Sequence, residues 1–155
     1  MMVDEVEPNL DTPALLAGAQ FADAFRIRVA GAALDARAAG ERMLGRRPRW
    51  VGTLLALRHA LVSPFGLKTS GGQPGADRIG MFPVLSVTPQ RLVAGFNDRH
   101  LDFRVVVDVA SSGEGQSVTA TTLVLTHNWL GRFYLAIILP FHRLIARTLL
   151  RQVAA

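Results

Sequence analysis

Residues 129–151, WLGRFYLAIILPFHRLIARTLLR, are the stretch from which the fold of this chain can be predicted. At about 100° per residue, the large apolar side chains fall within roughly half of a helical circumference, which predicts one long amphipathic helix. Its predicted core face consists of Phe133, Tyr134, Ile137, Ile138, Phe141, Leu144, Ile145 and Leu149, and the other side carries Arg132, Arg143, Arg147 and Arg151. Pro140 lacks a backbone N–H, so we expect the helix to bend there.

The sequence before this helix has a period of two, which is typical of β-strands. Alternation predicts strands near residues 79–87, 91–96, 100–109 and 117–127. A two-residue turn at 97–98 would pair Ala94 with Leu101 and Leu92 with Phe103, which sets apolar side chains against each other. Asn128 follows the last strand, and we expect it to cap the helix by accepting a hydrogen bond from a free backbone N–H.

The N-terminal half contains weaker signals. They predict a short helix at 14–19 after Thr12 and Pro13, a strand at 25–29, a weak helix at 32–44 and a clear amphipathic helix at 50–65. We therefore predict a single domain over residues 1–155, in which residues 1–20 form an N-terminal segment with the short helix. Residues 21–151 are predicted to form an α+β fold whose antiparallel sheet curves around the long C-terminal helix.

Composition excludes several classes of protein. The chain has no cysteine, so it has no disulfide, no thiolate nucleophile and no cysteine-ligated zinc. The N-terminus, MMVDEVE, is unlike a secretory signal, and the longest uninterrupted apolar stretch, Phe133–Phe141, is far shorter than the ~20 residues that span a bilayer. We expect a cytoplasmic protein without a transmembrane segment. The net charge is +5, but the arginines are scattered, so we expect no nucleic-acid partner.

The order of the predicted elements resembles the helix-grip architecture of START and Bet v 1-like proteins. That resemblance implies an apolar cavity between the sheet and the last helix. Particular strings are similar to a bacterial family, domain of unknown function 2867: Trp50, Leu57–Leu61, Phe65–Leu67, Ile79–Pro83, Asp98–Val105, Thr126–Asn128, Gly131–Leu135 and Pro140–Ile145. The family name implies no activity, and the resemblance supplies no catalytic residue.

Arg58 is the first candidate for a binding residue. It falls within the apolar arc of the 50–65 segment, where an unpaired guanidinium is costly. It would either pair with a carboxylate such as Asp102 or Glu41, or face the cavity and bind a ligand's acidic head group. The residues that we place at the predicted ligand site are Arg58, Tyr134, Phe141, Trp50, Arg104 and His127.

His100, Asp102 and Arg104 alternate with apolar residues, so all three project from one face of one predicted strand. His100 beside Asp102 could transfer protons near neutral pH. Alternatively, the three side chains form a solvated outer sheet face with cross-strand ion pairs. A metal site would need His127 as a further ligand from another strand, so we expect neither a metal nor a cofactor.

These residues leave several functions open. The leading hypothesis is a domain that binds an apolar or amphipathic small molecule between the sheet and the C-terminal helix. The alternative is a cyclase, dehydratase or isomerase that uses His100 and Asp102 as acid and base in the same cavity, although the sequence favours a protein that is not an enzyme. A third hypothesis is an interaction module that packs on a reductase or forms a homodimer. Its contact would be either the arginine side of the last helix or a strip of small residues on the 50–65 helix.

Overall fold

The protein was analysed as a computed structural model, which describes residues 3–8, 16, 18–30, 34–44, 78–79, 82–97, 101–112 and 115–153. The elements are β1 (Val3–Val6), β2 (Phe21–Ala30), α1 (Ala36–Leu44), β3 (Arg78–Ile79), β4 (Phe82–Val87), β5 (Arg91–Asn97), β6 (Leu101–Ser112), β7 (Gly115–Thr126) and α3 (Trp129–Arg151). The predicted helix at 50–65 lies outside the described residues. Of the predicted helix at 14–19, residues 16, 18 and 19 are described and none of them is helical, since Gly18 has a φ of +80°.

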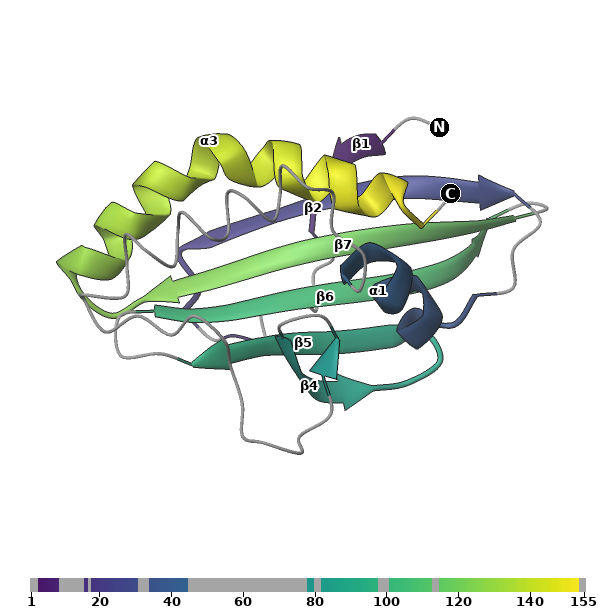
Figure 1. Ribbon diagram of the computed structural model, residues 1–155, viewed down its shortest axis with the longest axis horizontal. Coiled ribbons are helices and arrows are strands. Elements are labelled where there is room, and N and C mark those ends of the chain that lie inside the picture. The colour runs from purple at the N-terminus through teal and green to yellow at the C-terminus, as the bar shows by residue number, and fades with distance from the viewer. Residues whose placement is uncertain are drawn as a thin grey trace.

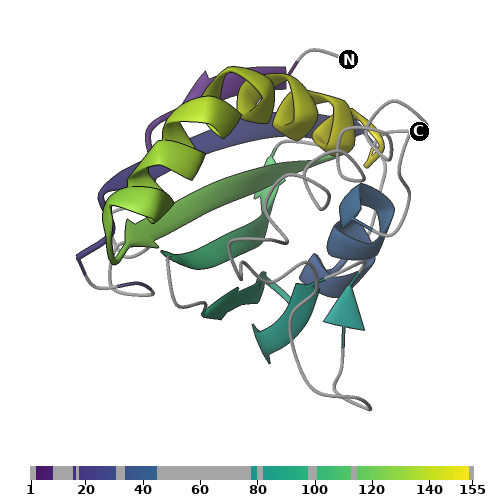
Figure 2. The same ribbon diagram turned by 60° about the vertical axis from the view of Figure 1, so that its left-hand side comes forward.

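The strands form one antiparallel sheet in the order β1-β2-β7-β6-β5-β4-β3. Strands β4 to β7 follow one another as a meander, whereas β2 pairs with β7 along its whole length. Helix α3 packs on β1, β2 and β7, and α1 packs on β3, β5 and β6 of the same sheet (Figure 1, Figure 2). The predicted α+β class is confirmed, and a C-terminal helix packed on an open antiparallel sheet is consistent with a helix-grip fold.

The strand register determines which side chains face the helices. Phe25 of β2 pairs with Ala120 of β7, Ala120 with Val107 of β6, and Val107 with Leu92 of β5. All four belong to the buried core cluster, so this row of side chains lies on the helix-facing side. Because side chains alternate along a strand, Asp102 on β6 projects from the opposite side.

The predicted two-residue turn between β5 and β6 is wrong. Ala94 pairs with Val105 rather than Leu101, and Leu92 pairs with Val107 rather than Phe103. The last pair of the ladder is Asn97 with Asp102, so the connection is longer than predicted. The shift is four residues, an even number, and therefore leaves each side chain on the face that was predicted for it.

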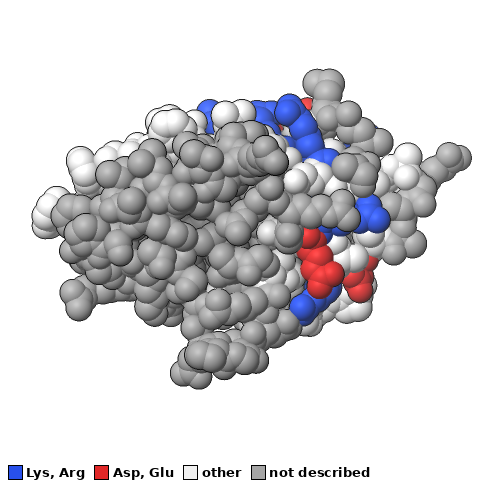
Figure 3. All heavy atoms as spheres, in the orientation of Figure 1, with Lys and Arg blue, Asp and Glu red and all other residues white. Residues whose placement is uncertain are grey.

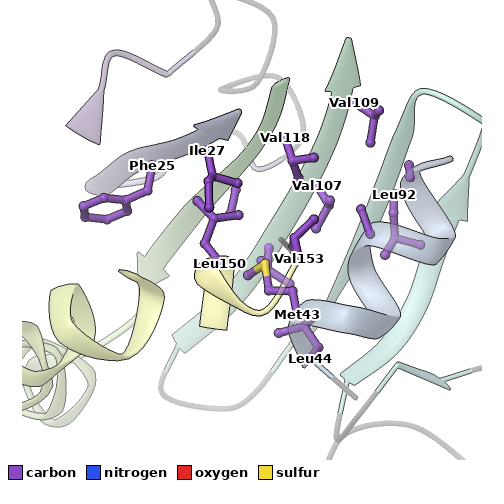
Figure 4. Close-up of a cluster of buried hydrophobic side chains, with 14 of the residues drawn as sticks. Phe25, Ile27, Met43, Leu44, Leu92, Val107, Val109, Val118, Leu150 and Val153 are labelled. Carbon is purple, nitrogen blue, oxygen red and sulfur yellow. The ribbon is translucent and has the colours of Figure 1, made fainter. Parts of the chain in front are cut away.

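The core is concentrated at one end of α3. Met43 and Leu44 from α1 meet Leu150 at the C-terminal end of α3 and Val153 just beyond it, above Val107 and its neighbours in the sheet (Figure 4). Among the described residues, the segment from Trp129 to Ile145 contributes no member to this cluster. The two ends of the same helix therefore have different environments.

Candidate ligand-binding surface on α3

The N-terminus of α3 is capped as the sequence predicts. The side-chain Oδ1 of Asn128 accepts a hydrogen bond of 3.0 Å from the backbone N–H of Gly131. Asn128 itself has an extended backbone, as N-cap residues do. This cap fixes the point at which β7 turns into the helix.

The C-terminal part of α3 is held by polar contacts. His142 Nε2 lies 3.1 Å from Asp23 Oδ2 on β2, and Arg147 Nη1 donates a 2.9 Å hydrogen bond to the carbonyl oxygen of Val3 on β1. The Arg147 guanidinium also lies 5.0 Å from the centre of the Phe25 ring, which is a cation–π distance. Beyond the helix, Gln152 Nε2 donates to the carbonyl oxygen of Met43 at 3.0 Å, which joins α3 to α1. These contacts place residues 142–152 firmly on the sheet.

The other side of α3 carries large apolar side chains that remain exposed. Trp129 is 72% exposed, and the other members of the set are 46–57% exposed. Successive members are four, four, four and three residues apart, so they lie along one side of the helix. We call this set the α3 strip; it consists of Trp129, Phe133, Ile137, Phe141 and Leu144.

The α3 strip corrects the predicted core face of this helix. Phe133, Ile137, Phe141 and Leu144 were expected to contact the sheet, but they are about half exposed. Among the described residues of the helix, those that are buried are instead Gly131, Ala146 and Leu150, on the opposite side, and Leu149 of the predicted face packs against the core cluster. Because nearly every side of α3 except the arginine side is apolar, the periodicity identifies an apolar arc without determining which part of it contacts the sheet.

The charge of α3 is entirely positive. The helix contains four arginines and no aspartate or glutamate. Arg132, Arg143 and Arg151 are exposed beside the strip, whereas Arg147 is half-buried by its contacts with β1 and β2. Figure 3 shows blue atoms at the upper edge of the molecule and further blue atoms lower, beside the red ones. An apolar partner with a negatively charged group would match this surface.

On the opposite face of the sheet, Asp102 pairs with His127. The distance from His127 Nε2 to Asp102 Oδ1 is 2.9 Å, and the Asp102 side chain is largely buried. Burial lowers the pKa of the neighbouring Arg104 guanidinium, and the charge of Asp102 partly opposes that effect. Arg104 Nη1 also donates to the carbonyl oxygen of Phe103 at 2.8 Å. Together with the Arg91–Asp108 ion pair at 2.6 Å, this surface carries the cross-strand ion pairs that the sequence offered as one alternative.

The predicted site residues therefore divide into separate groups. Phe141 belongs to the α3 strip, whereas Arg104, Asp102 and His127 lie away from it. Arg58, Trp50 and His100 lie outside the described residues, as does the side chain of Tyr134. Within the described part of the chain, no group of histidine and carboxylate side chains could hold a metal ion.

Sequence reasoning missed the contact between Asp23 and His142. The Asp23 side chain is only 7% exposed, and His142 Nε2 forms its hydrogen bond with Oδ1 at 3.2 Å. Asp23 has the same parity as Phe25 and Ile27, which would place it on the buried face of β2. That parity is the signal in the sequence that could have identified it.

A family model described as a protein of unknown function, DUF2867, matches residues 15–149. The chain belongs to this family. No curated protein matches the chain. The DUF2867 match runs from before β2 almost to the end of α3. It therefore includes the whole α3 strip and both members of the Asp23–His142 pair. Strand β1 lies outside the matched region.

Proposed function

We propose that this domain binds an apolar or amphipathic small molecule on the α3 strip. One observation carries the proposal: five large apolar side chains on one side of a helix remain exposed. Isolated exposed apolar residues are normal on protein surfaces, but contiguous patches mark sites of interaction. This proposal places the binding surface on the outer side of α3, whereas the sequence alone predicts a site between α3 and the sheet.

The size of the strip favours an amphipathic ligand over a purely apolar one. Covering a half-exposed Phe, Ile or Leu side chain contributes about 1 kcal/mol. Five such side chains give about 5 kcal/mol, which is on the scale of a millimolar dissociation constant before ordering costs are subtracted. A ligand with an acidic head group would gain further attraction from Arg132 or Arg143, which are exposed beside the strip.

The proposal is tested by measuring ligand binding in solution. Laurate and dodecanol, both kept below the concentrations at which they aggregate, would be titrated while the thermal midpoint is recorded. Native mass spectrometry would count the bound molecules. We expect both ligands to raise the midpoint, laurate more than dodecanol.

Two variants compare the strip with an exposed apolar residue outside it. Phe133→Ser with Ile137→Ser should abolish the shift, because it removes the central apolar contacts. Leu85→Ser should preserve the shift, since Leu85 is 50% exposed but lies on β4. An equal response from the two variant proteins, or no shift in the wild type, would refute binding on the strip.

A further inference from the structure

We propose that α3 docks this domain on the surface of an anionic lipid membrane, with the helix axis parallel to the surface. The inference rests on the proposed function, because the same strip makes the contact. It names the amphipathic molecule as a lipid within a bilayer.

The strip has the shape that a flat surface requires. From Trp129 to Leu144 there are fifteen steps along the helix, so the strip is about 22 Å long at 1.5 Å per residue. Its members lie on the side opposite Gly131 and Ala146, which are buried. Helix α3 also lies along the outer edge of the molecule, above the sheet (Figure 1, Figure 2). The strip therefore faces away from the sheet, where the surface of a membrane could approach it.

The charge of the helix selects an anionic surface. Arg132, Arg143 and Arg151 are exposed, and α3 has no acidic side chain to neutralise them. Aromatic and aliphatic residues on one side with arginines beside them are the features of helices that lie in a membrane interface. A second copy of this chain, placed strip to strip, would set arginines against arginines without an acidic partner on either helix. Charge complementarity therefore favours lipid phosphate over a second copy.

The contacts of α3 favour lying on the membrane over crossing it. Among the described residues, α3 is the one helix that is long and apolar enough to span a membrane by length and composition. Spanning would break the contacts of His142 with Asp23 and of Arg147 with Val3. It would also place Arg143 and Arg147 in hydrocarbon, where charged side chains are strongly disfavoured. The docked helix keeps these contacts and inserts only the strip.

Vesicle sedimentation tests this docking. The full chain would be mixed with vesicles of phosphatidylcholine alone or with 30% phosphatidylglycerol. We expect binding to the mixed vesicles at least tenfold stronger, and a fall in that binding when salt is raised from 0.1 to 0.5 M, because salt screens the arginine contacts. Equal affinity for the two vesicle types would overturn the anionic surface.

Three variants separate the contributions. Arg132→Gln with Arg143→Gln should weaken binding to the mixed vesicles about tenfold and leave the circular dichroism spectrum unchanged. Phe133→Ser with Ile137→Ser should abolish binding to both vesicle types. Arg28→Gln, which changes one exposed arginine on β2, is a charge control away from the strip and should bind as the wild type does. A loss of affinity in Arg28→Gln equal to that of the α3 arginine variant would attribute the binding to net charge alone and overturn the docking surface.

The outcomes also distinguish this inference from the function on which it rests. Wild-type protein that binds laurate in solution but no vesicles overturns the docking and keeps the small-molecule proposal. Protein that binds neither overturns both. Light scattering that finds a dimer, converted to a monomer by the Phe133 and Ile137 changes, would assign the strip to a second copy and overturn membrane docking.

Discussion

Asp23 is a carboxylate on the buried face of β2, and its partner His142 comes from the middle of α3. His142 Nε2 forms its hydrogen bond with Oδ1, so within the described part of the structure Oδ2 is buried without a hydrogen-bond partner. His142 also packs edge-on against Phe21, with ring centres 5.8 Å apart. This small group fixes the height of α3 above the sheet more specifically than apolar packing could.

We predict that His142→Leu destabilises the protein by about 3 kcal/mol, because it leaves the Asp23 carboxylate buried without its partner. The double variant Asp23→Leu with His142→Leu should lose less stability than His142→Leu alone, since both polar groups are then gone. Denaturant unfolding of the wild type, both single variants and the double variant measures the coupling. Additive losses would mean that the two side chains do not interact.

Gly95 on β5 gives a second prediction at the same scale. Its φ of +151° suits glycine, and an added Cβ would collide with the carbonyl oxygen of Phe103 on β6. Gly95→Ala should cost about 3 kcal/mol, from the collision and the backbone strain together. Gly18→Ala is the control, because Gly18 has a φ of +80° but its Cβ would meet only Leu125 Cδ1 at 3.7 Å. Thermal unfolding should find a clearly smaller loss for Gly18→Ala than for Gly95→Ala.

The pairing of Asp102 shows which contacts of a single residue can be predicted from the sequence. The sequence places Asp102 and Arg104 on one strand face, and β6 confirms that arrangement. The sequence supplied His100 as the nearest histidine, which lies outside the described residues, and the structure pairs Asp102 with His127, which directly follows the adjacent β7. Alternation determines the face of a strand, but the neighbour across a ladder depends on a register that spans many residues.

At the scale of elements, α3 was predicted well in extent and poorly in orientation. The helix runs from Trp129 to Arg151 with Pro140 inside it, as the period predicted. Its orientation depends on three buried positions, of which Gly131 and Ala146 have small side chains. Small residues allow the helix to approach the sheet closely, and hydrophobicity alone assigns them little weight.

The N-cap of α3 offers a test at this scale. Asn128→Ala should destabilise the protein by about 1 kcal/mol, because the N–H of Gly131 loses its acceptor. Asn128→Ser should retain most of that stability, since a serine hydroxyl also caps well. Denaturant midpoints provide the comparison. If the alanine and serine variants were equally stable, capping would not be the role of Asn128.

Across the whole molecule, the sheet begins with a strand that the sequence did not predict. Strand β1 has four residues with mixed polarity, so it lacks the alternation that identifies a strand. It pairs with β2 and supplies the carbonyl oxygen that accepts the hydrogen bond from Arg147. The order of the later elements could be predicted because each has a strong period. Strand β1 instead forms because its backbone pairs with the edge of β2, which its own sequence does not indicate.

Removing residues 1–7 tests the role of that edge. The deletion would leave β2 as the last strand of the sheet, with unpaired backbone groups, and would remove the acceptor of Arg147. We expect lower thermal stability and concentration-dependent oligomers in light scattering, because open strand edges associate. Glu5→Gln, an exposed change on β1, should keep the wild-type behaviour. A deletion variant as stable and as soluble as the wild type would refute this role of β1.

The uneven attachment of α3 has a consequence for its internal motion. Residues 142–152 are fixed to β1, β2 and α1, whereas the segment before Pro140 has its cap and few buried side chains. Backbone amides should therefore exchange with deuterium at two different rates within one continuous helix, quickly before Pro140 and slowly after His142. A helix of this kind can open from its N-terminal end while its C-terminal end remains folded.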